Sequence, residues 1–110
     1  VVLEGPLGGE SESLTPYFSW SSIRNAKNYT LTLASDEGMG TLLYTTDIKD
    51  QFFQYPKDAP PLANNTKYYW TVIANNEGGE AIGDRSDVGS FSTPLGVIEI
   101  EFIYGAGSRP

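Results

Sequence analysis

The stretch that decides the fold runs from Leu62 to Gly79 and reads LANNTKYYWTVIANNEGG. Alternate residues of a β-strand point to opposite faces of its sheet, so alternating large apolar groups predict a strand with one buried face. Tyr68 opens this strand six residues after Leu62, a placement by which β-sandwiches often tie an inter-sheet loop to the core. The predicted buried positions are Tyr68, Trp70, Val72 and Ala74.

The rest of the chain also divides into short strand-like runs, separated by Gly, Pro and Asn residues that favour turns. No segment carries an apolar stripe with helical period, so we expect no helix. We expect Trp20 and Trp70 to lie in the core, between two sheets. The pattern favours an all-β fold, a seven-stranded antiparallel Greek-key β-sandwich. The predicted strands cover residues 1–5, 14–20, 29–33, 42–46, 51–55, 67–75 and 88–93.

A further strand pattern lies beyond this sandwich, at residues 97–104, which read VIEIEFIY and precede a glycine-rich linker. We therefore divide the chain into a sandwich over residues 1–94 and a C-terminal strand and linker over residues 95–110. The strand can add to its own sheet, pair with a second copy as a homodimer interface, or open a following domain. Its apolar face, the candidate interface, holds Ile98, Ile100, Phe102 and Tyr104.

Histidine and cysteine are both absent from the 110 residues. Their absence removes the commonest general base, disulfide bonds and the thiolate ligands of metal sites. The net charge of −7 disfavours binding to nucleic acid and to anionic membranes. No apolar run approaches the roughly 20 residues that span a bilayer. We predict a protein that is not an enzyme, needs no cofactor or metal, binds no nucleic acid and does not insert into a membrane.

Several motifs follow one another along the chain: Phe18-Ser-Trp20, Ala26, Tyr29-x-Leu31-x-Leu33, the 62–74 block, Gly79 and Phe91-x-Thr93. Their order resembles a fibronectin type III domain, most of all the bacterial versions in secreted and cell-surface proteins. This resemblance covers residues 1–94. It implies an immunoglobulin-like sandwich that acts as a spacer or binding module beside other domains of its parent chain, with no catalytic residue to carry over. Because the chain starts at Val1, we expect a fragment of such a protein.

Candidate binding residues are the aromatic side chains on the faces opposite the predicted core. Tyr17, Tyr55 and Tyr69 fall on these faces, where they could stack on a glycan or fill a pocket of a protein partner. Packing between neighbouring strands on the outer face is the simpler interpretation. Phe52 and Phe53 must lie on opposite sides of their strand, so we expect one of the two rings to be exposed.

Two other patterns have a structural interpretation beside a functional one. Carboxylates in a glycine-rich loop could hold calcium, but their spacing matches no calcium loop we recognise, and solvated loop charges are favoured. Asn28 and Asn64 begin glycosylation sequons that matter only in a eukaryotic secretory pathway, and we interpret both as turn residues before strands. The loop carboxylates are Glu77, Glu80, Asp84 and Asp87.

Overall fold

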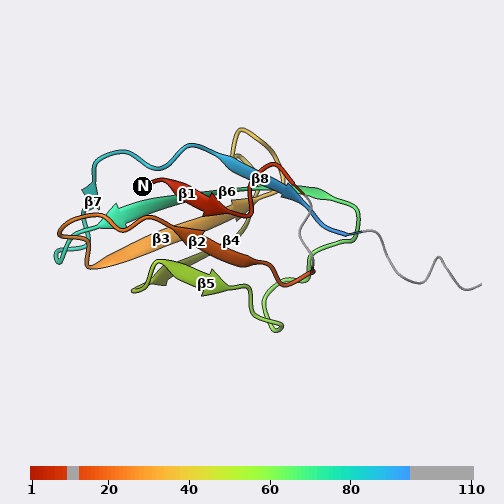
Figure 1. Ribbon diagram of the computed structural model, residues 1–110, viewed down its shortest axis with the longest axis horizontal. Helices are drawn as coiled ribbons and strands as arrows, with labels where there is room; N and C mark the ends of the chain where they lie inside the picture. Colours follow the sequence, from red (N-terminus) through yellow and green to blue (C-terminus); the bar gives the residue numbers. More distant parts are fainter. Residues whose placement is uncertain (10–12, 95–110) are drawn as a thin grey trace, which may run out of the picture.

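The computed structural model describes residues 1–9 and 13–94, which form two antiparallel sheets packed face to face (Figure 1). The three-stranded sheet has the order β1 (Leu3–Gly5), β2 (Tyr17–Trp20) and β5 (Phe52–Gln54). The five-stranded sheet has the order β4 (Leu42–Ile48), β3 (Asn28–Ala34) and β6 (Lys67–Asn75), and β6 also pairs with β7 (Ala81–Ile82) and β8 (Gly89–Ser92). The predicted all-β sandwich is confirmed, and the described residues contain no helix that could cross a membrane.

The second strand begins later than the sequence predicts, at Tyr17 rather than at residue 14. Pro16 comes directly before it and cannot donate a backbone hydrogen bond to a sheet ladder. The Thr15 N–H donates instead to the Ser13 hydroxyl at 2.7 Å, a local turn that competes with strand pairing. The first strand also begins later than the sequence predicts, at Leu3 rather than at Val1, and it ends at Gly5 as predicted.

One strand of the structure, β7, lies in a segment whose sequence predicts a loop. It consists of two residues that pair with the end of β6. The tight connection depends on the Asn76 N–H, which donates to the Glu80 carbonyl at 2.8 Å, and on Gly79, whose φ of 85° is readily adopted only by glycine. A strand this short has no alternation of its own, so only its pairing identifies it.

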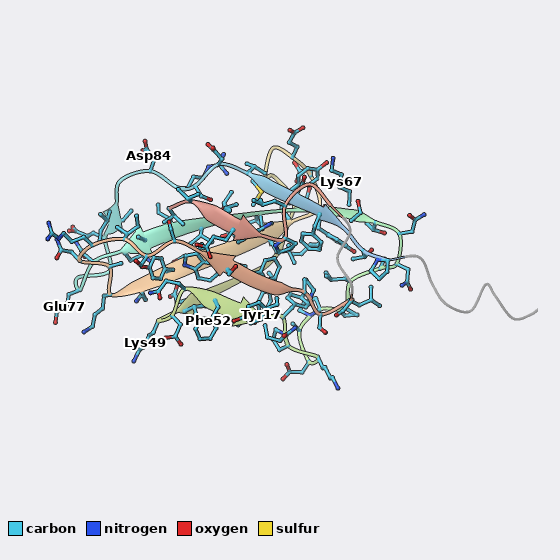
Figure 2. All side chains as sticks on the ribbon, in the orientation of Figure 1. Tyr17, Lys49, Phe52, Lys67, Glu77 and Asp84 are labelled. Atoms are coloured by element: carbon cyan, nitrogen blue, oxygen red, sulfur yellow. The ribbon has the colours of Figure 1, made fainter. Side chains whose placement is uncertain are left out.

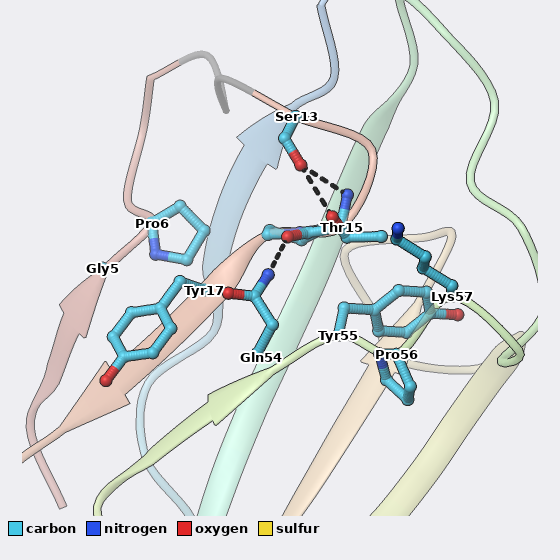
Figure 3. Close-up of a pocket in the computed structure, with 10 residues that line it drawn as sticks. Gly5, Pro6, Ser13, Thr15, Tyr17, Gln54, Tyr55, Pro56 and Lys57 are labelled. Atoms are coloured by element: carbon cyan, nitrogen blue, oxygen red, sulfur yellow. Dashed lines mark hydrogen bonds between the residues drawn. The ribbon is translucent and has the colours of Figure 1, made fainter.

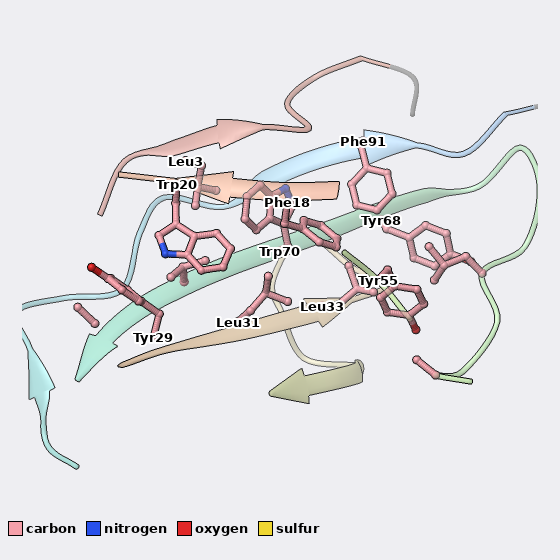
Figure 4. Close-up of a cluster of buried hydrophobic side chains, with 14 residues drawn as sticks. Leu3, Phe18, Trp20, Tyr29, Leu31, Leu33, Tyr55, Tyr68, Trp70 and Phe91 are labelled. Carbon is pink, nitrogen blue, oxygen red and sulfur yellow. The ribbon is translucent and has the colours of Figure 1, made fainter. Parts of the chain in front are cut away.

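Aromatic rings from both sheets meet in the core (Figure 4). Trp20 and Trp70 are 1% and 0% exposed and their ring centroids lie 6.4 Å apart, which confirms their predicted place between the sheets. Phe18 meets Trp70 edge-on at 4.8 Å and Phe91 edge-on at 5.8 Å. Such pairs contribute about 0.5–1.5 kcal/mol each beyond the burial of their area.

The chain that follows β1 closes one flank of the sandwich. The Gly8 N–H donates to the Ser90 carbonyl at 2.6 Å, and the Ser92 N–H donates to the Gly9 carbonyl at 3.0 Å. Residues 8–9 therefore occupy the side of β8 that faces away from β6. This contact links the two sheets through the backbone and leaves β8 without an open edge at these positions.

Trp70 also fixes the N-terminal segment through its indole ring. Its Nε1–H donates to the Pro6 carbonyl at 3.0 Å, across the space between the sheets. Gly89 leaves room for this arrangement, because a Cβ there would lie 2.8 Å from both Leu3 Cδ1 and Trp70 Nε1. Gly89 is therefore required because a larger residue would not fit, and not because of its dihedral angles.

Two hydroxyl groups tie the long loop between β5 and β6 to the core. The Tyr68 hydroxyl accepts a hydrogen bond from the Ala63 N–H at 2.8 Å, while the Thr93 hydroxyl donates to the Ala63 carbonyl at 2.5 Å. Leu62 is buried beneath this loop. The arrangement confirms the role predicted for Tyr68 from its spacing to Leu62.

The indole hydrogen bond predicts unequal effects for two similar substitutions. Trp70→Phe and Trp20→Phe both shrink a buried ring, but the Trp20 Nε1 finds no hydrogen-bond partner among the described residues. Trp70→Phe also leaves the Pro6 carbonyl without its donor. In urea unfolding, we expect Trp70→Phe to lose about 1 kcal/mol more free energy of unfolding than Trp20→Phe. Equal losses would contradict the role given to this hydrogen bond.

The loop anchor predicts a second difference, between neighbouring tyrosines. Tyr68→Phe removes the acceptor of the Ala63 N–H and should lower the free energy of unfolding by about 1 kcal/mol. Tyr69→Phe is the matched control, because the hydroxyl of the half-buried Tyr69 makes no hydrogen bond with a described residue. Thermal or urea unfolding of both variants tests this, and an equal effect of the two changes would refute the anchor.

Candidate functional site

Two large rings lie exposed side by side on the outer face of the three-stranded sheet (Figure 2). Tyr17 and Phe52 are 55% and 49% exposed, their centroids are 6.1 Å apart, and their planes differ by 17°. Tyr17 lies opposite Gln54 and Phe52 opposite Ser19, so the two rings are diagonal neighbours across β2 and β5. Adjacent exposed apolar groups mark interaction surfaces more often than isolated ones do.

An open groove of about 750 Å³ begins beside Tyr17 (Figure 3). Three segments line it: the end of β1, the chain that leads into β2, and the chain that follows β5. Its volume lies within the range of small-molecule sites, about 300–1,000 Å³. The polar groups along it come from Ser13, Thr15, Gln54 and Lys57.

Hydrogen bonds hold the polar wall of this groove in place. The Ser13 and Thr15 hydroxyls lie 2.9 Å apart, and the Gln54 amide donates to the Thr15 carbonyl across the two strands. Lys57 is exposed and makes no ion pair with a described residue. The site therefore combines an aromatic surface, fixed amide and hydroxyl groups and one available positive charge.

The prediction that Tyr55 lies on the outer face is wrong. Tyr55 is 2% exposed, its ring meets Tyr44 edge-on at 5.3 Å, and its hydroxyl donates to the Pro60 carbonyl at 2.5 Å. The reason is the register of β5 against β2, in which Phe53 lies opposite the buried Phe18. Tyr55 follows Phe53 by two residues and so faces the core as well.

Tyr69, the third tyrosine proposed for binding, lies on the outer face of the other sheet. It is half-buried, and the Lys67 Nζ lies 5.6 Å from its ring centroid in a cation–π contact. The structure thus does not bring the three predicted tyrosines together. The residue that sequence reasoning did not select is Phe52, since FFQY does not show which phenylalanine faces out until β5 is paired with β2.

The remaining predicted sites are the loop carboxylates and the C-terminal strand. Among residues 1–9 and 13–94, no three carboxylates come close enough to hold a metal ion. The proposed interface strand, with Ile98, Ile100, Phe102 and Tyr104, lies outside the described residues. The four loop carboxylates are exposed, as expected for solvated charges: Glu77, Glu80, Asp84 and Asp87.

Comparison with known proteins bears on the fold. The chain matches no protein-family model and no curated protein. It is similar to the crystal structure of an Fn3-like protein from Clostridium thermocellum, with a TM-score of 0.60 and 21% sequence identity over 84% of this chain and 93% of that one. The fold is Fn3-like. This agrees with the fibronectin type III resemblance of the sequence.

The burial of Tyr55 predicts a dependence of stability on alkaline pH. Burial raises the pKa of the Tyr55 phenol, and the nearby Tyr44 and Tyr68 add to the effect. The folded state therefore favours the protonated phenol. The stability that this phenol contributes is fully present below the pKa of tyrosine in the unfolded chain, about 10, and it is lost as pH rises through the folded pKa. We expect the free energy of unfolding to fall above about pH 10.

The Tyr55→Phe variant should lose less stability than the parent chain over this alkaline range, whatever its stability at neutral pH. Tyr17→Phe is the matched control, because it removes one exposed phenol and leaves the core intact. It should follow the parent curve. An unchanged alkaline slope in Tyr55→Phe would contradict the prediction, with urea unfolding at several pH values as the measurement.

Proposed function

We propose that this chain is a non-catalytic interaction module of a larger secreted or cell-surface protein of the bacterial type that its sequence resembles. One observation carries this proposal: the rings of Tyr17 and Phe52 are half-exposed and stacked side by side, and Tyr17 also lines the groove. By contrast, Phe18 and Trp20 of this sheet and Tyr55, just after β5, are buried.

The chemistry of this surface favours a glycan as the ligand. A sugar ring has an apolar face of C–H groups and a rim of hydroxyls, so its recognition needs an aromatic surface together with polar groups at the edge. Tyr17 and Phe52 supply the aromatic surface, and the Gln54 amide and the Lys57 ammonium supply the polar groups at its edge. Binding sites commonly combine apolar walls with a few fixed polar groups in this way.

Rigidity supports the same proposal, because a preorganised surface loses little conformational entropy on binding. Both aromatic residues belong to paired strands, and the groove wall is linked through Thr15. A rigid sandwich of this kind also separates neighbouring domains, so a spacer role is compatible with glycan binding in the parent protein.

Removal of both rings should weaken glycan binding. The full chain is screened on a glycan array, and the best soluble hit is titrated by calorimetry against the Tyr17→Ala/Phe52→Ala variant. We expect at least a tenfold weaker Kd, about 1.4 kcal/mol. Tyr69→Ala is the control, because it removes a ring from the opposite sheet and should leave the Kd unchanged.

Two outcomes would count against the proposed ligand. Glycan binding that survives loss of both rings would show that the sugar binds elsewhere on the chain. Absence of any glycan hit, together with retention of a protein partner that depends on Tyr17 and Phe52, would assign the same surface to protein recognition. Absence of both kinds of ligand would leave the spacer role alone.

A further inference from the structure

The aromatic pair and the groove form one continuous strip that runs parallel to the strands of the smaller sheet. In the antiparallel pairing of β2 and β5, Phe52 lies opposite Ser19. Two residues further along β5, Gln54 lies opposite Tyr17. The groove begins at this second pair and continues away from the first. The exposed surface therefore extends in one direction, from Phe52 through Tyr17 into the groove.

The two chain segments stay together beyond the end of β5, so the strip is longer than the paired strands. The Tyr55 N–H donates to the Pro16 carbonyl at 2.9 Å, which continues the ladder past the last residue of β5. From Phe52 to Pro56, which lines the groove, the chain covers up to about 13 Å at about 3.3 Å per residue. Because a pyranose ring is close to a benzene ring in size, one sugar covers only part of this length.

The two ends of the strip differ in shape. Phe52 lies on the outer face of the sheet and is not among the residues that line the groove. The groove has a wall on each side, formed by Gly5 and Pro6 at the end of β1 and by Pro56 and Lys57 after β5 (Figure 3). A short sugar therefore makes most of its contacts in the groove, whereas the ring of Phe52 adds a contact that only a longer chain reaches.

We propose that this site binds a linear, extended oligosaccharide of at least three sugars, which lies along β2 and β5 from the groove to Phe52. This inference rests on the proposed glycan function and specifies the class of glycan. Phe52, Tyr17 and the groove then each contact a different sugar. Sugars joined through equatorial bonds form straight, ribbon-like chains that can follow such a strip, whereas malto-oligosaccharides coil and lift successive sugars away from it.

The pair of rings can bind such a chain without rearrangement. The centroids of Tyr17 and Phe52 lie 6.1 Å apart, their planes differ by 17°, and both residues belong to paired strands. Binding therefore orders little of the protein, and each added sugar contact increases the affinity until the strip is full. The expected signature is an affinity that rises with chain length and then becomes constant.

The test measures the Kd of the full chain by calorimetry for oligosaccharides from the disaccharide to the hexasaccharide. Cello-, xylo- and chito-oligosaccharides are straight chains with different ring substituents, so all three series are used. In at least one of them we expect the Kd to fall about tenfold or more between the disaccharide and the tetrasaccharide, and to change little beyond it. Malto-oligosaccharides should show no such gain. Absence of a gain with length in every straight series would overturn the proposal.

Two substitutions at Phe52 locate the gain. Phe52→Ala should remove most of the gain with length but change the Kd of the disaccharide by less than about twofold, because the disaccharide binds in the groove. Phe52→Tyr keeps a ring and should keep the gain. Leu42→Ala is the control, because it removes an apolar side chain of similar exposure, 57% against 49%, from the other sheet. Near-ultraviolet circular dichroism confirms that each variant is folded.

Failure of this inference differs from failure of the glycan function on which it rests. If no oligosaccharide of any length binds, or if binding survives the loss of both Tyr17 and Phe52, the glycan function fails and the inference fails with it. If oligosaccharides bind through the two rings but Phe52→Ala weakens every length by the same factor, glycan binding stands and the lengthwise arrangement is overturned. A gain with length in the malto series alone would also overturn the arrangement.

Discussion

The packing of Trp70 between the two sheets is the contact on which the rest of this structure depends. Its ring is fully buried against Phe18 and Trp20, and its indole N–H holds the carbonyl of Pro6. The segment after Pro6 then lies against β8, which closes one flank of the sandwich. Burial of aromatic area supplies the driving force, and the single hydrogen bond sets where the N-terminal strand lies.

The same closure leaves the molecule asymmetric. One flank is sealed by backbone hydrogen bonds, whereas the opposite flank exposes β4 and β5 and is filled on the inside by Tyr44, Phe53 and Tyr55. Contacts with other molecules are therefore expected on that side. The proposed glycan surface is formed by outer side chains of the three-stranded sheet, which include the exposed Phe52 of β5.

Local patterns in the sequence predict correctly whether a residue is buried where the alternation of its own strand determines its face. Trp70 and Tyr68 were placed correctly because alternation along residues 67–75 fixes their face. The prediction that Tyr55 is exposed is wrong, and the exposure of Phe52 is not predicted, because the outward face of FFQY depends on the register of β5 against β2. That register is a contact between segments that are distant in the sequence. β7 was missed for a related reason: its two residues form a strand only through pairing with β6. Strand register and pairing depend on contacts between segments that are distant in the sequence, so a single sequence contains little information about them.

Ligand binding at the exposed pair of Tyr17 and Phe52 can be mapped residue by residue. Backbone amide chemical shifts of the full chain would be followed by NMR during titration with a soluble oligosaccharide. We expect the shifts to cluster on β2, β5 and the groove that runs from Ser13 to Lys57. Shifts confined to the five-stranded sheet would contradict the account.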